Sequence, residues 1–387
     1  MIQVLCVLIA ATGCLGCVMG YAFLGLYTIL GKPMFSNRKL SISCLRSPSF
    51  WFVLIFGFLY ALIGNRTISG FTNYCLAGAI AYYSGWLIIE RTEDGKLQTQ
   101  VEKWFLVLIC GAGIHSLLNL LTNMGAARLD IIDFFTRQRL SATCAGANNT
   151  LIFSLFVCIL IISKQRTAKI LGTICFGVSL AYALLLASRT QFVILGIAAI
   201  VTLAVFNFQR YGLWGCIRFI LIIFVLILIA YLAYTNNVFG IADSLNSTNL
   251  FLRLEMQDTL DSSDSVRVER FMMGIKSLFQ NIMGNPDDPY YHNMFLDVGR
   301  KAGLFPTIFL LLFTLRTMRV ALRIFSSRIL SLTVKCYSLL SLTGILLNCM
   351  VEPVMEGVLD LFILFVFISG MVESVYRKNS IAFTSHQ

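Results

Sequence analysis

The sequence predicts an all-α protein, a polytopic transmembrane helical bundle of about 11 to 12 spans with one large outward-facing loop at residues 235–302. Apolar residues fill 58% of the 387 positions and charged residues only 13%, which is too little charge to coat a soluble globule of this size. Long apolar windows recur along the chain, and the loops between them alternate in basic charge. We therefore expect a single integral membrane domain over residues 1–387, with the loop at 235–302 inside it.

The predicted spans follow from the apolar windows, because a helix that crosses a bilayer needs about 20 mostly apolar residues. The first window can be one tilted helix or a tight pair broken near Gly13, Gly16 and Gly20, so eleven and twelve crossings both stay open. The windows lie near residues 4–30, 50–64, 71–89, 104–121, 145–163, 170–187, 191–207, 217–234, 303–315, 332–350 and 357–372.

The distribution of Lys and Arg predicts which loops face the cytoplasm. Nineteen of the 30 basic residues fall in one alternating set of loops, which the positive-inside rule assigns to the cytoplasmic side. The others are nine Arg and two Lys, and a planar guanidinium binds phosphate through two N–H groups at once. An anionic partner is therefore expected on the outer face. Because the net charge of +11 is accounted for by these membrane loops, nucleic acid is not an expected partner.

Signatures of soluble enzymes are missing from the sequence, which has no Walker A loop, dinucleotide-binding glycine fingerprint, GxSxG or HExxH motif. Three His are too few to favour a metal site built on imidazole, and the 12 Cys lie mostly in apolar stretches without CxxC spacing. We expect neither a metal nor a cofactor.

The outer loop contains the first group of candidate residues. Apolar residues recur at helical spacing over 265–279, with Arg267 and Arg270 near the start, which predicts an amphipathic helix near the membrane surface. A turn-rich segment follows and leads to His292, whose ordinary pKa of about 6.5 suits a base near neutral pH. The simpler interpretation is an interfacial helix whose arginines reach lipid phosphates.

Charged residues near other outer span ends form a second group. Arg189 joins two apolar segments with almost no linker, so it is expected at the outer mouth of a helical hairpin, as an anchor or a ligand for phosphate. Glu352, Glu356 and Asp360 recur every four residues, which predicts one helix face that pairs with loop arginines.

Several of these residues, in this order, resemble the O-antigen polymerase and O-antigen ligase family of bacterial envelope proteins. The resemblance covers roughly residues 180–315, and the rest of the chain agrees as multi-span topology. It rests on the pair Ser188-Arg189 after a span, on Arg267, Phe271 and Gly284 in the long loop, on His292-Asn293, and on Gly303-Leu304-Phe305 at the next span.

The resemblance implies a GT-C-like membrane glycosyltransferase in the bacterial cytoplasmic (inner) membrane, with its active site facing the periplasm or exterior. Its substrate would be an undecaprenyl-pyrophosphate-linked glycan, and its partners the lipid bilayer and a chain-length regulator. His292 and Arg267 would be catalytic, with His292 deprotonating the acceptor hydroxyl. The pyrophosphate would be held by Arg189, Arg267 and Arg270, and the supporting residues would be Asn293, Gly284 and Gly303.

Two other functions stay open beside a polymerase of oligosaccharide repeat units. One is an O-antigen ligase, which transfers finished glycan to the lipid A core. The other is a transporter or flippase for lipid-linked sugars, a class that usually carries ionisable groups near the bilayer midplane. The predicted spans contain little of that kind beyond His115, expected in mid-span, which favours the polymerase.

Overall fold

The computed structural model describes residues 2–13, 20, 22–26, 43–93, 95–125, 131–135, 137–139, 142–240, 242–243, 263–352 and 354–384. Within these ranges the chain forms helices and their connections, and the only bridge between extended residues joins Ile132 to Arg139. The elements are α1 (Ile2–Thr12), α4 (Pro48–Gly64), α5 (Ile68–Gly70), η1 (Phe71–Leu76), α6 (Ala77–Glu90), α7 (Leu97–Thr122), α8 (Ala142–Ala147), α9 (Thr150–Ile162), α10 (Arg166–Leu185), α11 (Arg189–Thr235), η3 (Val238–Gly240), α14 (Ser263–Gln280), α15 (Met294–Ala302), α16 (Leu304–Ser326), α17 (Leu332–Cys349), α18 (Val354–Gly357) and α19 (Leu359–Thr384). The predicted all-α class is confirmed.

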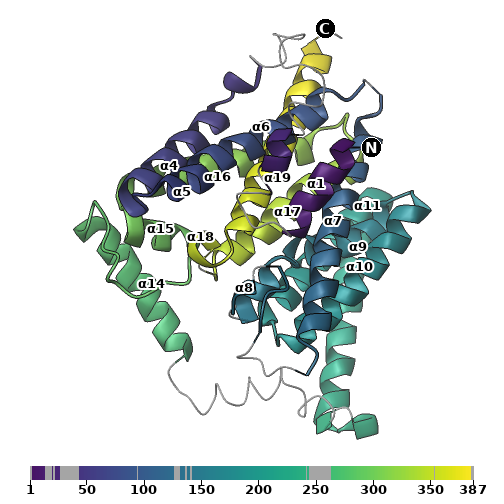
Figure 1. The fold of residues 1–387 in the computed structure, drawn as a ribbon. Helices are drawn as coiled ribbons and strands as arrows, with labels where there is room; N and C mark the ends of the chain where they lie inside the picture. The colour runs from purple at the N-terminus through teal and green to yellow at the C-terminus, as the bar shows by residue number, and fades with distance from the viewer. Residues whose placement is uncertain are drawn as a thin grey trace.

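The bundle has two ends (Figure 1). Helices α8, α14, α15 and α18 lie at one end, which we call the α14 end, and both chain termini lie toward the other, which we call the terminal end. Six helices among the described residues are long and apolar enough to cross a membrane: Leu97–Thr122, Ala145–Ile162, Arg166–Leu185, Arg189–Gly215, Leu332–Cys349 and Leu359–Ser380. The chain is therefore a multi-pass membrane protein by the length and composition of its helices.

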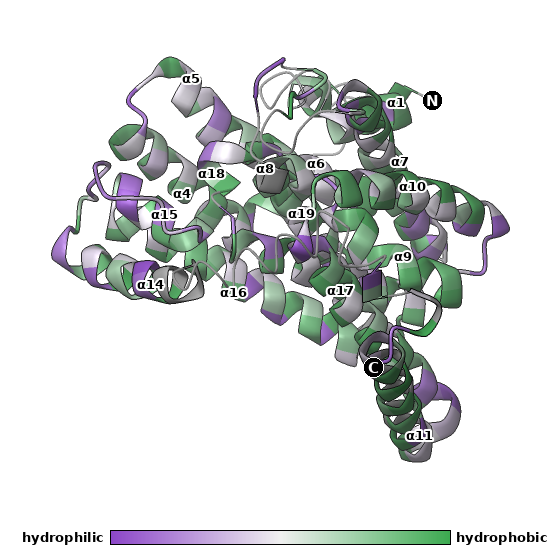
Figure 2. Cartoon of the chain, turned by 90° about the horizontal axis from the view of Figure 1, so that it is seen from below, coloured by the Kyte–Doolittle hydropathy of each residue, from purple (hydrophilic) through white to green (hydrophobic). Residues whose placement is uncertain are grey.

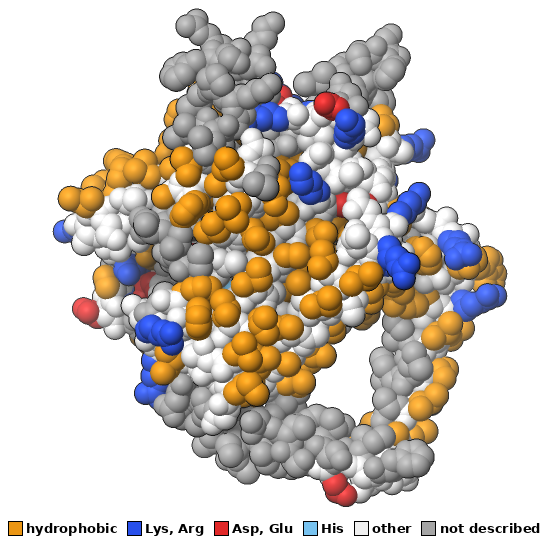
Figure 3. Space-filling view, turned by 45° about the vertical axis from the view of Figure 1, so that its right-hand side comes forward, with side chains coloured by type: hydrophobic (Ala, Val, Ile, Leu, Met, Phe, Trp, Pro, Cys, Tyr) orange, Lys and Arg blue, Asp and Glu red, His pale blue; other side chains and the backbone are white. Residues whose placement is uncertain are grey.

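Hydrophobic side chains cover the middle of the face of the molecule that is seen in Figure 3. In Figure 3 they form a broad patch between Lys and Arg side chains at the upper right and others at the lower left. In Figure 2, α11 projects from the edge of the bundle and is mostly hydrophobic. Such a surface would be unstable in water and suits contact with lipid.

Helix α19 lies at the centre of the bundle, and 83% of its apolar window is buried. It packs closely on α6, because Gly85 and Gly370 have no side chains to separate the two backbones. A Cβ built on Gly370 would lie 2.1 Å from the Tyr82 carbonyl oxygen, and one on Gly85 would lie 2.0 Å from that of Phe367. Small residues permit this kind of close helix packing in membranes.

A buried carboxylate ties four parts of the bundle together near the terminal end. Glu373 of α19 accepts hydrogen bonds from the hydroxyls of Ser47 at 2.8 Å, Ser49 at 2.5 Å and Tyr82 at 2.9 Å. Arg316 of α16 donates to the same carboxylate at 2.9 Å. A charge with this many donors is tolerated away from water.

Helix α11 is a hairpin rather than one straight rod. The bend is at Gly212, where φ is 63° and ψ is −153°. A Cβ built on Gly215 would lie 2.7 Å from the Asn207 carbonyl oxygen, whereas residues eight apart in a straight helix are separated by about 12 Å. This agrees with the separate apolar windows predicted at 191–207 and 217–234.

The first apolar window is interrupted as well. Helix α1 ends at Thr12, and Gly13 follows with a φ of 63°. Beyond residues 14–19, which lie outside the described part of the chain, a Cβ on Gly20 would lie 3.8 Å from Ala10 Cα. The chain therefore returns alongside α1, as the tight-pair alternative predicts.

Candidate functional site

The two ends of the segment between α14 and α16 cross each other, with their backbones in direct contact. Leu304 N donates to Ile282 O at 2.9 Å, and Asn285 N donates to Arg300 O at 2.7 Å. Gly284 and Gly303 lie at the crossing with φ values of 86° and 85°, a backbone conformation that residues other than glycine rarely adopt. These two supporting residues of the predicted site therefore fix the path of the chain on both sides of His292.

His292 and Asn293 form the turn that leads into α15. His292 is half-buried and has a φ of 54°, unusual for a residue other than glycine. Asn293 Oδ1 accepts hydrogen bonds from Phe295 N at 3.1 Å and Leu296 N at 3.3 Å, the geometry of a helix N-cap. The predicted supporting role of Asn293 thus has a physical basis, because it anchors His292 to the start of α15.

Asp297 holds the same turn from inside. Its carboxylate accepts the backbone N–H of Tyr291 at 2.8 Å and that of Asn293 at 3.2 Å. The side chain is 1% exposed, and burial raises the pKa of this carboxyl from 3.8 to about 6, although the two backbone hydrogen bonds and Arg300 favour the charged form. A carboxyl with this pKa titrates near neutral pH.

An ion pair connects α15 to α18. Arg300 Nη2 donates to Glu356 Oε1 at 2.8 Å, and Lys301 Nζ lies 3.4 Å from the same oxygen. The Arg300 guanidinium is also 4.3 Å from the centre of the Tyr290 ring, whose hydroxyl donates to Glu356. That hydrogen bond to the carboxylate is the main reason why the pKa of Tyr290 is raised.

The acidic residues near the last span therefore do not share one helix face, and that prediction is wrong. The chain breaks twice between α17 and α19, so that Glu352 lies in the turn before α18, Glu356 in α18 and Asp360 in the first turn of α19. The expected pairing with a loop arginine is confirmed for Glu356.

The predicted helix at 265–279 is confirmed as α14, and it packs on α15. A Cβ on Gly274 would lie 2.9 Å from the Tyr291 ring, so this face of α14 lies directly against the segment that bears His292. Arg270 is half-buried on α14, and Arg267 lies one turn earlier, with its side chain outside the part of the structure that is described. Residues 244–262 of the predicted loop also lie outside the described residues.

Arg189 belongs to another part of the α14 end. It is the first residue of α11, after Ser188, and α10 ends at Leu185, so the predicted short hairpin is confirmed. Two residues later, Gln191 Nε2 donates to Gly146 O at 2.9 Å, which attaches the start of α11 to α8. Gly284, His292, Asn293 and Gly303 thus form one unit with α14, and Arg189 lies with α8 and α9.

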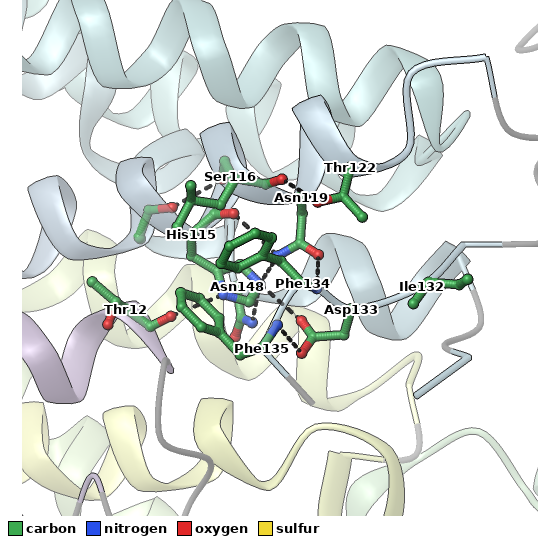
Figure 4. A network of polar contacts seen from close by, with 12 residues as sticks. Thr12, His115, Ser116, Asn119, Thr122, Ile132, Asp133, Phe134, Phe135 and Asn148 are labelled. Atoms are coloured by element: carbon green, nitrogen blue, oxygen red, sulfur yellow. Dashed lines mark hydrogen bonds and ion pairs between the residues drawn. The ribbon is translucent and has the colours of Figure 1, made fainter. Parts of the chain in front are cut away.

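A second polar centre surrounds His115 (Figure 4). The histidine is 4% exposed, and its Nδ1 is 2.9 Å from the Thr12 carbonyl oxygen, which assigns a proton to Nδ1. Its Nε2 then accepts from Asn119 Nδ2 at 3.1 Å and Asn148 Nδ2 at 3.0 Å. Asp133 Oδ1 lies 4.0 Å from the same nitrogen.

This centre is absent from the predicted sites, because hydropathy alone places His115 as an isolated residue in mid-span. The structure places His115 two turns before the end of α7. There it contacts Thr12 at the end of α1 and Asn148 in the turn that precedes α9. A local signal was present, since His115, Asn119 and Asn123 recur every four residues and so share a helix face. Asn123 uses this face to hold Ile132, with its Oδ1 accepting from Ile132 N at 2.8 Å.

The chemistry available in the part of the chain that is described is that of acids, bases and cations. Within it, no three His, Cys, Asp or Glu side chains lie close enough together to hold a metal ion. Comparison of the chain with protein-family models, with curated proteins and with solved structures finds no match.

Proposed function

We propose that this chain is a membrane glycosyltransferase that polymerises undecaprenyl-pyrophosphate-linked oligosaccharide repeat units, an O-antigen or capsular polysaccharide polymerase. In this proposal it is a GT-C-like protein of 11 to 12 spans in the bacterial inner membrane. The α14 end is its outer face, consistent with the concentration of Lys and Arg in the opposite set of loops.

The observation that carries the proposal is the meeting of separate parts of the family-like pattern in one unit. Gly284, His292-Asn293 and Gly303 are spread over 20 residues of sequence. The backbone crossing brings the two glycines into contact, and the segment that bears His292 lies between them in the chain. The arginine-bearing helix α14 packs on the same segment. This arrangement supports a site in which a base and cations act on one substrate.

The proposed reaction joins the acceptor sugar to the donor glycan. The acceptor hydroxyl oxygen bonds to the anomeric carbon of the donor, His292 takes the hydroxyl proton, and the bond from that carbon to the pyrophosphate oxygen breaks. Arg267, Arg270 and Arg189 neutralise the charge that develops on the departing undecaprenyl pyrophosphate. Guanidinium groups supply that charge stabilisation without requiring a metal.

A complementation experiment tests this function. In a strain lacking the gene, the wild-type chain should restore a ladder of long glycans, whereas His292→Ala, Arg267→Ala and Arg189→Ala should each leave single repeats at an unchanged protein level. Arg66→Ala is the matched control, because Arg66 is an exposed cation in another loop predicted to be outward. Normal ladders from all three site variants would refute the site.

The form of the defect separates the alternatives. Loss of single repeats from the glycolipid in the deletion strain would indicate a ligase instead. Movement of lipid-linked sugar across sealed vesicles by the purified chain, without any change in glycan length, would indicate a transporter. Retention of single repeats together with glycan elongation by the purified chain is the result that supports the polymerase.

A further inference from the structure

A surface pocket of about 680 Å³ lies away from the proposed glycan site, at the end of α16 that is remote from α15. Its walls come from the last two turns of α16, the loop that follows and the C-terminal part of α19. Three arginines line it: Arg319 and Arg323, which are four residues apart on α16 and so share a face, and Arg328 in the loop.

The positive charge of this pocket is not neutralised within the described residues. Neither Arg319 nor Arg328 makes an ion pair with any of them, and no carboxylate occurs in the described lining. Arg323 donates to the Tyr376 hydroxyl at 3.1 Å, which occupies one of its five N–H donors. Most of the N–H groups of these three guanidiniums therefore have no acceptor among the described residues.

Arg316, one turn earlier on the same helix, shows what a paired arginine looks like in this bundle. It donates to Glu373 at 2.9 Å and to Ser49 Oγ at 3.0 Å. The contrast along α16 means that the three lining arginines are not needed to balance buried acids. Their charge is available to a ligand.

The remainder of the wall is amphipathic. Asn379 Nδ2 donates to Ser327 Oγ at 3.2 Å, which attaches the loop to α19 and leaves the Asn379 carbonyl and nearby hydroxyls as further polar groups. Leu322 and Ile329 also line the pocket, and they are 54% and 61% exposed. Apolar side chains beside three cations suit a ligand that has an anionic head and an apolar body.

We propose that this pocket binds a phosphate group, whose oxygens accept hydrogen bonds from the guanidinium N–H groups of Arg319, Arg323 and Arg328. A phosphate accepts two N–H groups from one guanidinium, and several such contacts give both charge and geometry. The phosphate can belong to an anionic lipid headgroup or to a soluble phosphate compound. The exposed Leu322 and Ile329 favour the lipid, because a soluble anion gains nothing from them.

The test uses the full chain in detergent micelles, with native mass spectrometry giving an apparent Kd for phosphatidylglycerol. The variant R319Q/R323Q/R328Q should weaken binding at least about tenfold. The matched control K164Q/R166Q/K169Q removes three charges from the loop between α9 and α10 and the first turn of α10, at the same end of the bundle but outside the pocket. It should change the Kd less than about threefold, because charge at a distance is largely screened.

Two further arms complete the test. Competition by millimolar inorganic phosphate would identify a soluble phosphate compound as a source, and lack of competition would identify the lipid headgroup. If the triple variant is not monodisperse after purification, the loop variant Arg328→Gln alone should still weaken binding at least about threefold. Equal weakening in the pocket and control variants, or no weakening in either, would overturn the proposal.

Discussion

Gly284 and Gly303 pack backbone against backbone, because a Cβ built on Gly284 would lie 2.8 Å from the Gly303 amide nitrogen. Their contact sets the distance between the end of α14 and the start of α16, and His292 lies on the segment between them. The position of the proposed base thus depends on two residues that carry no functional group.

Replacing Gly303 with Ala should therefore affect both stability and activity. The new Cβ would lie 2.1 Å from the Ile282 carbonyl oxygen, and a φ of 85° costs a non-glycine residue about 1–3 kcal/mol before any clash. We expect a lower midpoint of thermal unfolding in detergent and loss of long glycan. Gly196→Ala is the control, since it lies in a helix with nothing within 4 Å of its Cβ. If both variants melt like the wild type, the crossing is not structurally important.

Arg300 should contribute much more to stability than its neighbour Lys301. Arg300 is 6% exposed and pairs with a Glu356 side chain that is 14% exposed, so Arg300→Ala leaves a largely desolvated carboxylate without its closest cation. Breaking such a pair costs about 3–5 kcal/mol. Lys301 is 23% exposed and lies farther from Glu356, and Lys301→Ala should cost less than about 1 kcal/mol. Equal losses in chemical unfolding would contradict this assignment.

Asp297 should make stability depend on pH between about 4 and 6. Its pKa is about 6 in the folded chain and near 3.8 when exposed, so the folded state binds this proton more tightly. Its contribution is therefore greatest below pH 4 and declines as pH rises toward 6, by at most about 3 kcal/mol. Asp297→Asn removes the titration. The unfolding free energy of the wild type minus that of the variant should fall as pH rises from about 4 to 6. Parallel plots of unfolding free energy against pH for the two proteins would contradict this role of Asp297.

His115 should hold the end of α1 in place. His115→Ala removes a partner of the Thr12 carbonyl and the Nε2 acceptor shared by the buried Asn119 amide and the half-buried Asn148 amide, at about 1–3 kcal/mol for each group left unsatisfied. We expect faster hydrogen exchange in α1, measured by mass spectrometry. Ile114→Ala is the control, because that side chain is 40% exposed. Unchanged exchange in α1 for the His115 variant would show that the network is dispensable.

Local sequence patterns predicted most of the long apolar helices and some of the turns, but not the short helices α8, α15 and α18. Apolar windows predicted the two arms of α11, and the pair Ser188-Arg189 predicted a hairpin with almost no linker. These features depend on residues close together in sequence, so hydropathy and spacing report them directly.

Contacts between distant residues could not be predicted in the same way. The His115 centre joins Thr12 to Asn148, and neither residue has a local pattern that indicates the other. The expected acidic face failed for a related reason. Spacing of four residues implies one face only if the helix is continuous, and the breaks between α17 and α19 separate Glu356 from Asp360. The predicted site includes the segment around His292 but not the Asp297 carboxylate, which holds the backbone of that segment.

The central position of α19 has a consequence for how the chain is made. Helix α19 leaves the ribosome after the helices that enclose it, and its Glu373 accepts hydrogen bonds from the hydroxyls of Ser47, Ser49 and Tyr82, which are synthesised hundreds of residues earlier. During biosynthesis the earlier helices must keep a slot for it or close around one another and reopen. The earlier helices therefore cannot reach their final packing until α19 has entered between them.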